Sequence, residues 1–192
     1  MRDPHRAFVV AMFVDMTDFR SFAETADPEV LFATLQQYHR LVGEAVDASG
    51  GQVIDFAGDG IFAVFNDRVP LPSPELTAVS TAIALRDSFD DVAARWAREG
   101  AQLGIKFGLD AGHATLGRIG YEGHWAYGAI GRVVINAALI SRRARSRQIF
   151  ASERVASAIE GHVVASPVED VTDPKLSRPL RIVEVTAAGV PA

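Results

Sequence analysis

The hydrophobic pattern at the start of the chain predicts a buried strand. Residues 8–14 are almost continuously apolar and rich in β-branched and aromatic side chains, and Asp15 ends the run. A strand covered on at least one face has this pattern. The Asp-Pro pair at 27–28 is typical of a helix start, and apolar residues then recur at helical spacing until Gly50. We therefore expect a long helix here, preceded by a helical turn at 19–25.

Two further apolar runs, at 53–56 and 61–65, flank an Ala-Gly-Asp-Gly sequence at 57–60. Glycines on both sides of an aspartate permit the positive φ angles that a tight hairpin needs. The pattern predicts a hairpin with Asp59 at its tip. Taken alone, a Gly-Asp-Gly turn indicates only a polar turn, because so short a motif occurs in many unrelated chains.

The next stretch completes a regular order of elements. The helical pattern returns at 74–99, a strand is predicted at 105–110, and the glycine-rich residues 112–120 predict a turn and a returning strand. The elements up to this point follow the order βαββαβ. This order is typical of a ferredoxin-like α+β fold, in which an antiparallel sheet carries both helices on one face.

The rest of the chain predicts a C-terminal αβ extension of this core. The expected elements are a strand at 125–130, a helix at 133–143, a strand at 148–151, a short helix at 152–159 and a strand at 180–185. Apart from that last strand, we expect residues 161–192 to be irregular, since Pro167 and Pro179 limit regular pairing.

Composition restricts the class of protein. With 192 residues and 48% hydrophobic content, residues 1–192 are expected to form one domain. The formal net charge of -5 argues against a nucleic-acid partner. The absence of cysteine excludes disulfides and thiolate chemistry. The N-terminal apolar run is too short to span a membrane, so we expect no membrane partner and a cytoplasmic location.

Two aspartates suggest the chemistry. In a ferredoxin-like sheet the first strand and the hairpin can lie side by side, so Asp15 and Asp59 are expected to converge. Two close carboxylates repel each other unless a cation lies between them. Mg²⁺ and Mn²⁺ take oxygen ligands supplemented by substrate phosphates. The pair therefore predicts a two-metal site for phosphoryl transfer.

Three ordered motifs resemble the catalytic domain of the class III nucleotidyl cyclases. The pattern F-x-D-M-x-x-F, formed by Phe13, Asp15, Met16 and Phe19, is similar to the metal-binding signature of that family. F-A-G-D-G-I-F-A-V-F at 56–65 and G-L-D-A-G-x4-G-x-I-G at 108–120 are similar to its next two motifs. The resemblance covers about residues 8–160.

The resemblance implies a homodimer with active sites at the subunit interface. There the 3′-hydroxyl of a nucleoside triphosphate attacks its own α-phosphate and expels pyrophosphate. By position in the motifs, Asp15, Met16 and Asp59 would bind two Mg²⁺ or Mn²⁺ ions, and Phe19 would belong to the substrate site.

The resemblance also implies cations for the phosphates. Lys106 falls where the family usually has a phosphate-binding arginine, and it keeps the charge without the bidentate fork. Arg145 and Arg147 lie just before the strand where the family supplies a further phosphate-binding cation. On the helix that precedes them, Asn136 and Arg143 are the candidate catalytic residues.

Several positions depart from the family pattern. Asp55 replaces the lysine that reads adenine in adenylyl cyclases, and a carboxylate accepts from N–H groups such as those of guanine, uracil or cytosine. Gly128, at the second base-reading position, offers no side chain. Ile135 and Leu139 take the places of the transition-state asparagine and arginine. Asn136 comes one residue late, which turns a helical side chain by about 100°.

Two interpretations follow from these departures. In the first, the pocket is rebuilt for another base, as in the similar stand-alone pyrimidine cyclases of bacterial antiphage signalling. Asp55 accepting from uracil N3–H then makes UTP, cyclised to cyclic UMP, the leading substrate ahead of CTP, GTP and ATP. In the second, the domain is a degenerate homologue that dimerises or senses nucleotides. The two retained metal aspartates, Asp15 and Asp59, favour the first.

Overall fold

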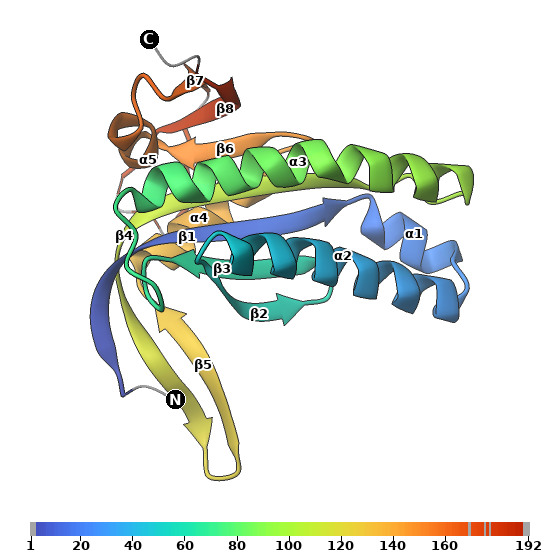
Figure 1. The fold of residues 1–192 in the computed structure, drawn as a ribbon, viewed down its shortest axis with the longest axis horizontal. Coiled ribbons are helices and arrows are strands. Elements are labelled where there is room, and N and C mark those ends of the chain that lie inside the picture. The colour runs from blue at the N-terminus through green and yellow to red at the C-terminus, as the bar shows by residue number, and fades with distance from the viewer. Residues whose placement is uncertain (1–2, 169, 175, 177, 190–192) are drawn as a thin grey trace.

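The computed structural model describes residues 3–168, 170–174, 176 and 178–189, and it confirms the predicted βαββαβ order (Figure 1). The elements of this core are β1 (His5–Thr17), α1 (Phe19–Thr25), α2 (Pro28–Ala48), β2 (Gln52–Ala57), β3 (Gly60–Phe65), α3 (Pro74–Arg98) and β4 (Gly104–Tyr121). The extension comprises β5 (His124–Ile130), α4 (Arg132–Arg143), β6 (Ile149–Ser152), α5 (Glu153–Ala158), β7 (Val163–Pro167) and β8 (Ile182–Ala188).

The strands form a single, mostly antiparallel sheet. Their order is β2-β3-β1-β4-β6-β8-β7, and β5 pairs with β4 outside this path. Only the pairing of β4 with β6 is parallel among the described strands. β1 thus lies between β3 and β4, which places the end of the first strand beside the tip of the β2–β3 hairpin.

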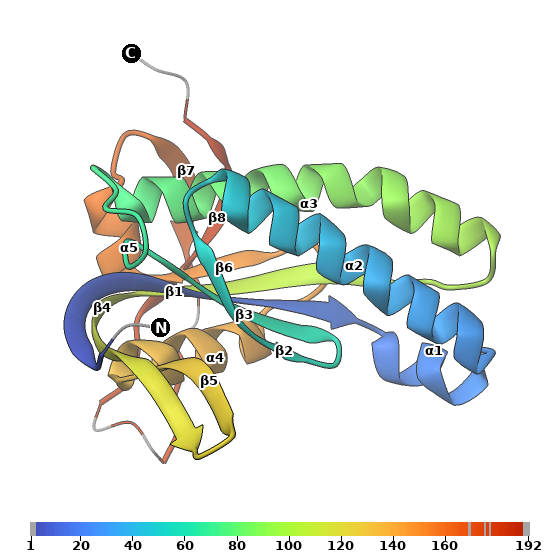
Figure 2. The same ribbon diagram turned by 60° about the horizontal axis from the view of Figure 1, so that its bottom comes forward.

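Helices cover both faces of this sheet. α2 and α3 pack on one face over the main core, which includes Met12, Tyr38, Phe89 and Phe107. This confirms the expectation that both core helices share a face. α4 covers the opposite face, where Val133 and Ala137 pack on Val9 and Leu116 of the sheet (Figure 2). The main sheet is therefore covered on both sides, whereas the apolar β1 sequence predicted cover on at least one face.

The expected turn within residues 112–120 is wrong, because β4 continues without a break to Tyr121. The glycines in this stretch permit close approach of other chain segments instead. A Cβ at Gly117 would lie 2.7 Å from the Cα of Pro4, and one at Gly120 would overlap the carbonyl oxygen of His124. Glycine in a strand often marks such a close backbone approach.

The C-terminal region is more regular than expected. The strand predicted at 180–185 corresponds to β8, but β7 was not predicted, and it pairs antiparallel with β8. β7 reads Val-Val-Ala-Ser-Pro, a short stretch without apolar–polar alternation, so the sequence did not predict a strand there. Pairing with β8 through the backbone forms this strand, and such pairing does not depend on an apolar face.

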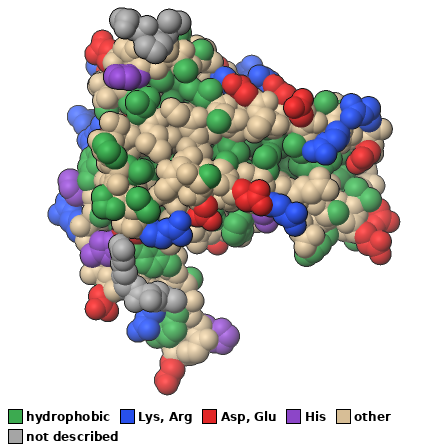
Figure 3. Space-filling model, in the orientation of Figure 1, with side chains coloured by type: hydrophobic (Ala, Val, Ile, Leu, Met, Phe, Trp, Pro, Cys, Tyr) green, Lys and Arg blue, Asp and Glu red, His purple; other side chains and the backbone are tan. Residues whose placement is uncertain are grey.

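The far parts of β4 and β5 form a hairpin that projects from the body of the molecule (Figure 3). Ile119, Tyr121 and Trp125 are exposed on it, and the Arg118 guanidinium lies 4.2 Å from the centroid of the Trp125 ring. On the face viewed in Figure 3, acidic and basic side chains are interspersed. No helix in the described ranges has the length and apolar character needed to cross a membrane.

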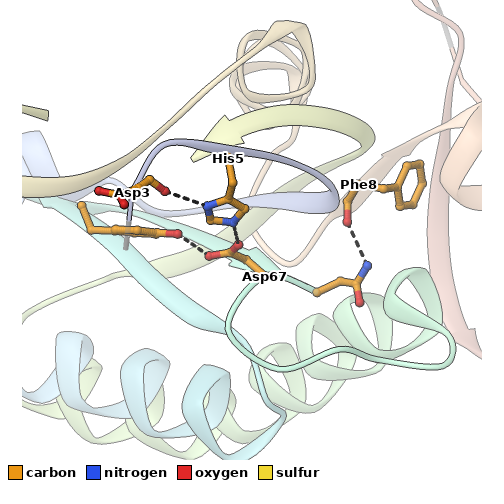
Figure 4. A network of polar contacts seen from close by, with 6 residues as sticks. Asp3, His5, Phe8 and Asp67 are labelled. Carbon is orange, nitrogen blue, oxygen red and sulfur yellow. Dashed lines mark hydrogen bonds and ion pairs between the residues drawn. The ribbon is translucent and has the colours of Figure 1, made fainter. Parts of the chain in front are cut away.

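A buried carboxylate anchors the base of this hairpin. Asp67, in the loop after β3, accepts a hydrogen bond of 2.6 Å from the hydroxyl of Tyr127 in β5. Its other oxygen lies 2.6 Å from Nε2 of His5, whose Nδ1 faces the carbonyl of Asp3 (Figure 4). The network joins the start of β1, the β3–α3 loop and β5, so it orients the projecting hairpin on the sheet.

Replacing Gly108 by alanine is expected to lower the free energy of unfolding by about 1–3 kcal/mol, because overpacking forces backbone shifts. A Cβ at Gly108 would overlap the backbone of Ser141 and Ala137 in α4. Gly112→Ala is the matched control on the same strand, since its Cβ would first meet Arg154 Nη1, the end of a flexible side chain, at 3.3 Å. Urea unfolding of both variants measures the difference, and equal losses would contradict this close contact of α4 with β4.

Candidate functional site

Asp15 lies near the end of β1, between two neighbouring strands. In the antiparallel register it stands opposite Gly60 of β3 and opposite Lys106 of β4. A Cβ at Gly60 would lie 2.9 Å from Asp15 Oδ1. The glycine therefore leaves space for the carboxylate at the point where the hairpin turns.

Asp59, at the hairpin tip, lies beside the same strand end. Its backbone carbonyl accepts a 3.0 Å hydrogen bond from the amide of Met16. The hydroxyl of buried Tyr38 donates to the carbonyl of Val14 at 3.0 Å. Burial raises the pKa of Tyr38, and the charges of Asp15 and Asp59 raise it further. The Met16–Asp59 backbone hydrogen bond and the pairing of Asp15 with Gly60 place both aspartates at the same end of β1.

Ser141 of α4 also reaches this site, and sequence reasoning missed it. The Ser141 hydroxyl donates to Asp15 Oδ2, although the two residues are 126 positions apart in the chain. The serine is 1% exposed. Ser141 follows Ala137 by four residues, so the two lie on the same side of α4, which faces the sheet. This spacing is the sequence signal that could have placed Ser141 near the site.

The donor set fits a hard divalent cation. Asp15 and Asp59 supply carboxylate oxygens, and no group of three His, Cys, Asp or Glu side chains that could hold a metal occurs among the described residues. Mg²⁺ is usually bound through one or two carboxylates plus substrate phosphates rather than by an all-protein cage. The Met16 side chain is buried in the core, so a role for this residue would fall to its backbone carbonyl.

Two predicted substrate residues lie close to this strand end. Lys106 is half-buried and directly opposite Asp15 in the β1–β4 register. Phe19, the first residue of α1, packs partly against the main core. A lysine opposite Asp15 in the register suits a site that must also bind phosphates.

The two predicted base-reading positions lie elsewhere on the sheet. Asp55 is exposed on β2, opposite Phe62 and next to a register shift in the β2–β3 pairing. Gly128 lies on β5 beneath Ile119, whose Cδ1 would be 2.5 Å from a Cβ at that position. An added side chain at Gly128 would therefore displace Ile119.

Asn136 does not join Asp15 and Asp59 within one chain. Its amide Nδ2 donates to Oδ2 of buried Asp110 at 2.8 Å, and its Oδ1 is buried without a hydrogen-bond partner in the described chain. Asp110 lies four residues beyond Lys106 on β4, a separation of about 13 Å along a strand. Asn136 and Asp110 line a cavity of about 810 Å³ between β4, α4, α5 and the segment before β8.

The three predicted arginines follow the end of α4 or lie on its last turn. Arg143 and Arg145 are exposed. Arg147 forms an ion pair with Asp90 of α3, and its φ of 68° lies in the left-handed region. The pairing directs Arg147 toward α3, although its side chain remains 51% exposed.

Solved structures share this fold. The adenylyl cyclase CyaB from P. aeruginosa superposes with a TM-score of 0.94 at 24% identity, over 100% of both chains. The guanylyl cyclase Cya2 gives a TM-score of 0.91 at 24% identity, over 97% of this chain and 95% of the other. The architecture is therefore the one used by nucleotidyl cyclase domains.

Sequence comparison defines the family. The sequence model of the adenylate and guanylate cyclase catalytic domain matches residues 3–172. The chain belongs to the adenylate and guanylate cyclase catalytic domain family, whose members generally depend on divalent metal ions.

Two curated relatives illustrate the range of full-length proteins. Adenylate cyclase 1 of Rhizobium meliloti (strain 1021) is 32% identical over 130 residues, which are 67% of this chain and 20% of that protein. Adenylate cyclase type 10 of Mus musculus is 28% identical over 152 residues, which are 74% of this chain and 9% of that protein. The chain thus spans at most a fifth of the length of these two relatives.

Asp110→Asn is expected to be more stable than the parent chain by a margin that grows as the pH rises from the ordinary aspartate pKa to the raised pKa of Asp110. Burial raises the pKa of Asp110 above its ordinary 3.8, against the opposing hydrogen bonds of Ser152 and Asn136 and the charge of Arg154. An acid with a raised pKa in the folded state binds its proton more tightly there than in the unfolded chain. Folding stability therefore falls as the pH rises through this interval, and asparagine cannot ionise.

Urea unfolding of Asp110→Asn and the parent at several pH values measures this trend. Asp91→Asn, at an exposed position of α3, is the matched control and should show no such trend. A stability difference that stays constant with pH for Asp110→Asn would contradict the effect of burial.

Proposed function

We propose that this chain is a metal-dependent nucleotidyl cyclase domain that converts a nucleoside triphosphate into a 3′,5′-cyclic nucleotide and pyrophosphate. The observation that carries this proposal is the position of Asp15 and Asp59 at the same end of β1, in a chain of the cyclase family. Together with the Met16 carbonyl, they would hold two Mg²⁺ or Mn²⁺ ions. Such ions, when bound, activate the attacking hydroxyl and neutralise charge on the triphosphate.

The chain's own residues would orient the triphosphate. Lys106, opposite Asp15 in the β1–β4 register, would contact phosphate oxygens that approach the two aspartates. Arg145 is a better phosphate contact than Arg147, because Asp90 already engages Arg147. Phe19 would border the substrate at the start of α1. Positioning and electrostatic stabilisation supply most of the catalysis in phosphoryl transfer.

We propose UTP as the substrate and cyclic UMP as the product. The exposed carboxylate of Asp55 on β2 can accept a hydrogen bond from uracil N3–H, whereas it cannot donate to a ring nitrogen. Gly128 adds no competing side chain. A cyclic pyrimidine nucleotide would serve as a second messenger, and antiphage defence in the cytoplasm is the role that the resemblance to pyrimidine cyclases suggests.

The proposed active unit is a homodimer with its sites at the subunit interface. Within one chain, Asn136 is bonded to Asp110, about 13 Å along β4 from the position opposite Asp15. A second chain would have to present the α4 side chains, Asn136 or Arg143, to the carboxylate pair. The apolar side chains exposed on the projecting β4–β5 hairpin offer contact surface for such a partner.

A catalytically inactive module that dimerises or senses nucleotides is the second candidate function. Ile135, at the place of the transition-state asparagine, is 51% exposed and apolar. Asn136 is held by Asp110 rather than free for substrate. Each missing transition-state donor ordinarily costs a factor of about 100 or more in rate.

The purified protein with Mn²⁺ and each of the four nucleoside triphosphates is expected to form cyclic UMP from UTP as its dominant product. Chromatography and mass spectrometry of the products measure this. Asp59→Ala should lower the rate by about 100-fold or more, because the carboxylate pair is then incomplete. A dominant cyclic AMP product would refute the pyrimidine assignment, and no turnover of any triphosphate would favour the inactive module.

The variant Asp55→Asn is expected to lower the preference for UTP over ATP by about tenfold, since an amide oxygen accepts a hydrogen bond weaker by about 1.4 kcal/mol than a carboxylate does. The ratio of kcat/KM for the two substrates is the measurement. Asp47→Asn, at an exposed position near the end of α2, is the matched control and should leave the ratio unchanged. An unchanged ratio in Asp55→Asn would mean that this carboxylate does not read the base.

A further inference from the structure

The Ser141 hydroxyl differs from the hydroxyls of Ser88 and Thr81, which also lie in a helix, in the acceptor of its hydrogen bond. A serine or threonine inside a helix commonly donates to the carbonyl three or four residues earlier in the same helix. Ser88 in α3 does so with Leu85, and Thr81 does so with Thr77. Ser141 instead donates across to Asp15 Oδ2 on β1.

The packing of α4 on β4 makes this contact possible. Gly108 lies directly below α4, where any Cβ would overlap the backbone of Ser141 and Ala137. The glycine lets the helix approach closely enough for a short serine side chain to reach the neighbouring strand. Ser141 is 1% exposed, so water does not compete for its proton.

The contact constrains both oxygens of the Asp15 carboxylate. Ser141 holds Oδ2, while Oδ1 lies on the side of Gly60, next to the hairpin tip that carries Asp59. Rotation of the carboxylate about its Cβ–Cγ bond would break the hydrogen bond from Ser141. Hydrogen-bonded partners of this kind orient metal ligands, and their loss typically costs 10- to 100-fold in metal affinity or activity.

We propose that Ser141 is a positioning residue that fixes the Asp15 carboxylate in the orientation required to bind a divalent metal ion. This role for Ser141 rests on the proposed function in one respect, which is that Asp15 is a metal ligand. Because Ser141 belongs to α4, it also links the metal-binding carboxylate to the helix that carries Asn136 and Arg143. A shift of α4 relative to β4 would release Asp15, so metal affinity depends on the position of this helix.

Titration of the protein with Mn²⁺ alone tests the proposal, with electron paramagnetic resonance of the free ion as the readout. Ser141→Ala is expected to bind Mn²⁺ about tenfold more weakly than the parent chain. Ser141→Cys, which keeps the size and a weak S–H donor, should fall between the two. Ser88→Ala removes a helical hydroxyl that bonds only within α3, and it should leave the affinity unchanged.

Kinetics give a second readout. In Ser141→Ala the Mn²⁺ concentration for half-maximal rate should rise about tenfold, with kcat at saturating Mn²⁺ within a few-fold of the parent. A purely structural defect would lower kcat without moving the metal dependence. Thermal unfolding monitored by circular dichroism verifies that each variant is folded.

The outcomes separate this proposal from the proposed function. If the parent binds Mn²⁺, Asp15→Asn does not, and Ser141→Ala binds like the parent, the positioning role is overturned while the metal site stands. If the parent and Asp15→Asn bind Mn²⁺ equally weakly, the metal site itself is wrong and the role of Ser141 is overturned with it. Weaker binding by Ser141→Ala in a chain that produces no cyclic nucleotide supports the positioning role and contradicts only the proposed activity.

Discussion

The pairing of β1 with both of its neighbours is the constraint on which the candidate site depends. Its register sets Asp15 opposite Gly60 on one side and Lys106 on the other, so an aspartate, a glycine and a lysine lie side by side near one strand end. A slip of one residue would turn Asp15 to the other face of the sheet. That face carries the apolar core beneath α2 and α3, where an unpaired carboxylate would be very costly.

α4 brings a second set of polar contacts to the same sheet. Near its C-terminal end Ser141 binds Asp15, and one and a half turns earlier Asn136 binds buried Asp110. Both contacts require the helix to lie directly on β4, which Gly108 permits. Two side-chain hydrogen bonds, Ser141 to Asp15 and Asn136 to Asp110, therefore fix α4 on its own subunit. In the proposed dimer the same helix would supply side chains to the partner's active site.

These contacts divide the chain into a retained part and a changed part relative to the family pattern. Asp15, Asp59 and the hairpin retain what the proposed metal-dependent phosphoryl transfer would need, whereas Lys106 keeps only the charge of the family's arginine. The changed part is α4 and the base-reading positions, where Ile135 is exposed and Asn136 is engaged by Asp110. Such a division suits a cyclase that keeps its reaction and alters its substrate, and the proposed UTP specificity depends on it.

The sequence by itself determined the core βαββαβ order and placed Asp59 at a hairpin tip, because apolar periodicity and the positions of glycine and proline are local signals. It did not reveal the unbroken continuation of β4 through residues 112–120 or the formation of β7, since both depend on pairing with other strands. Only the tertiary structure joined Ser141 to Asp15 and Asn136 to Asp110. The physical reason is that both contacts arise from the close packing of α4 on β4, and residues 126 and 26 positions apart carry no mutual signal in a single sequence.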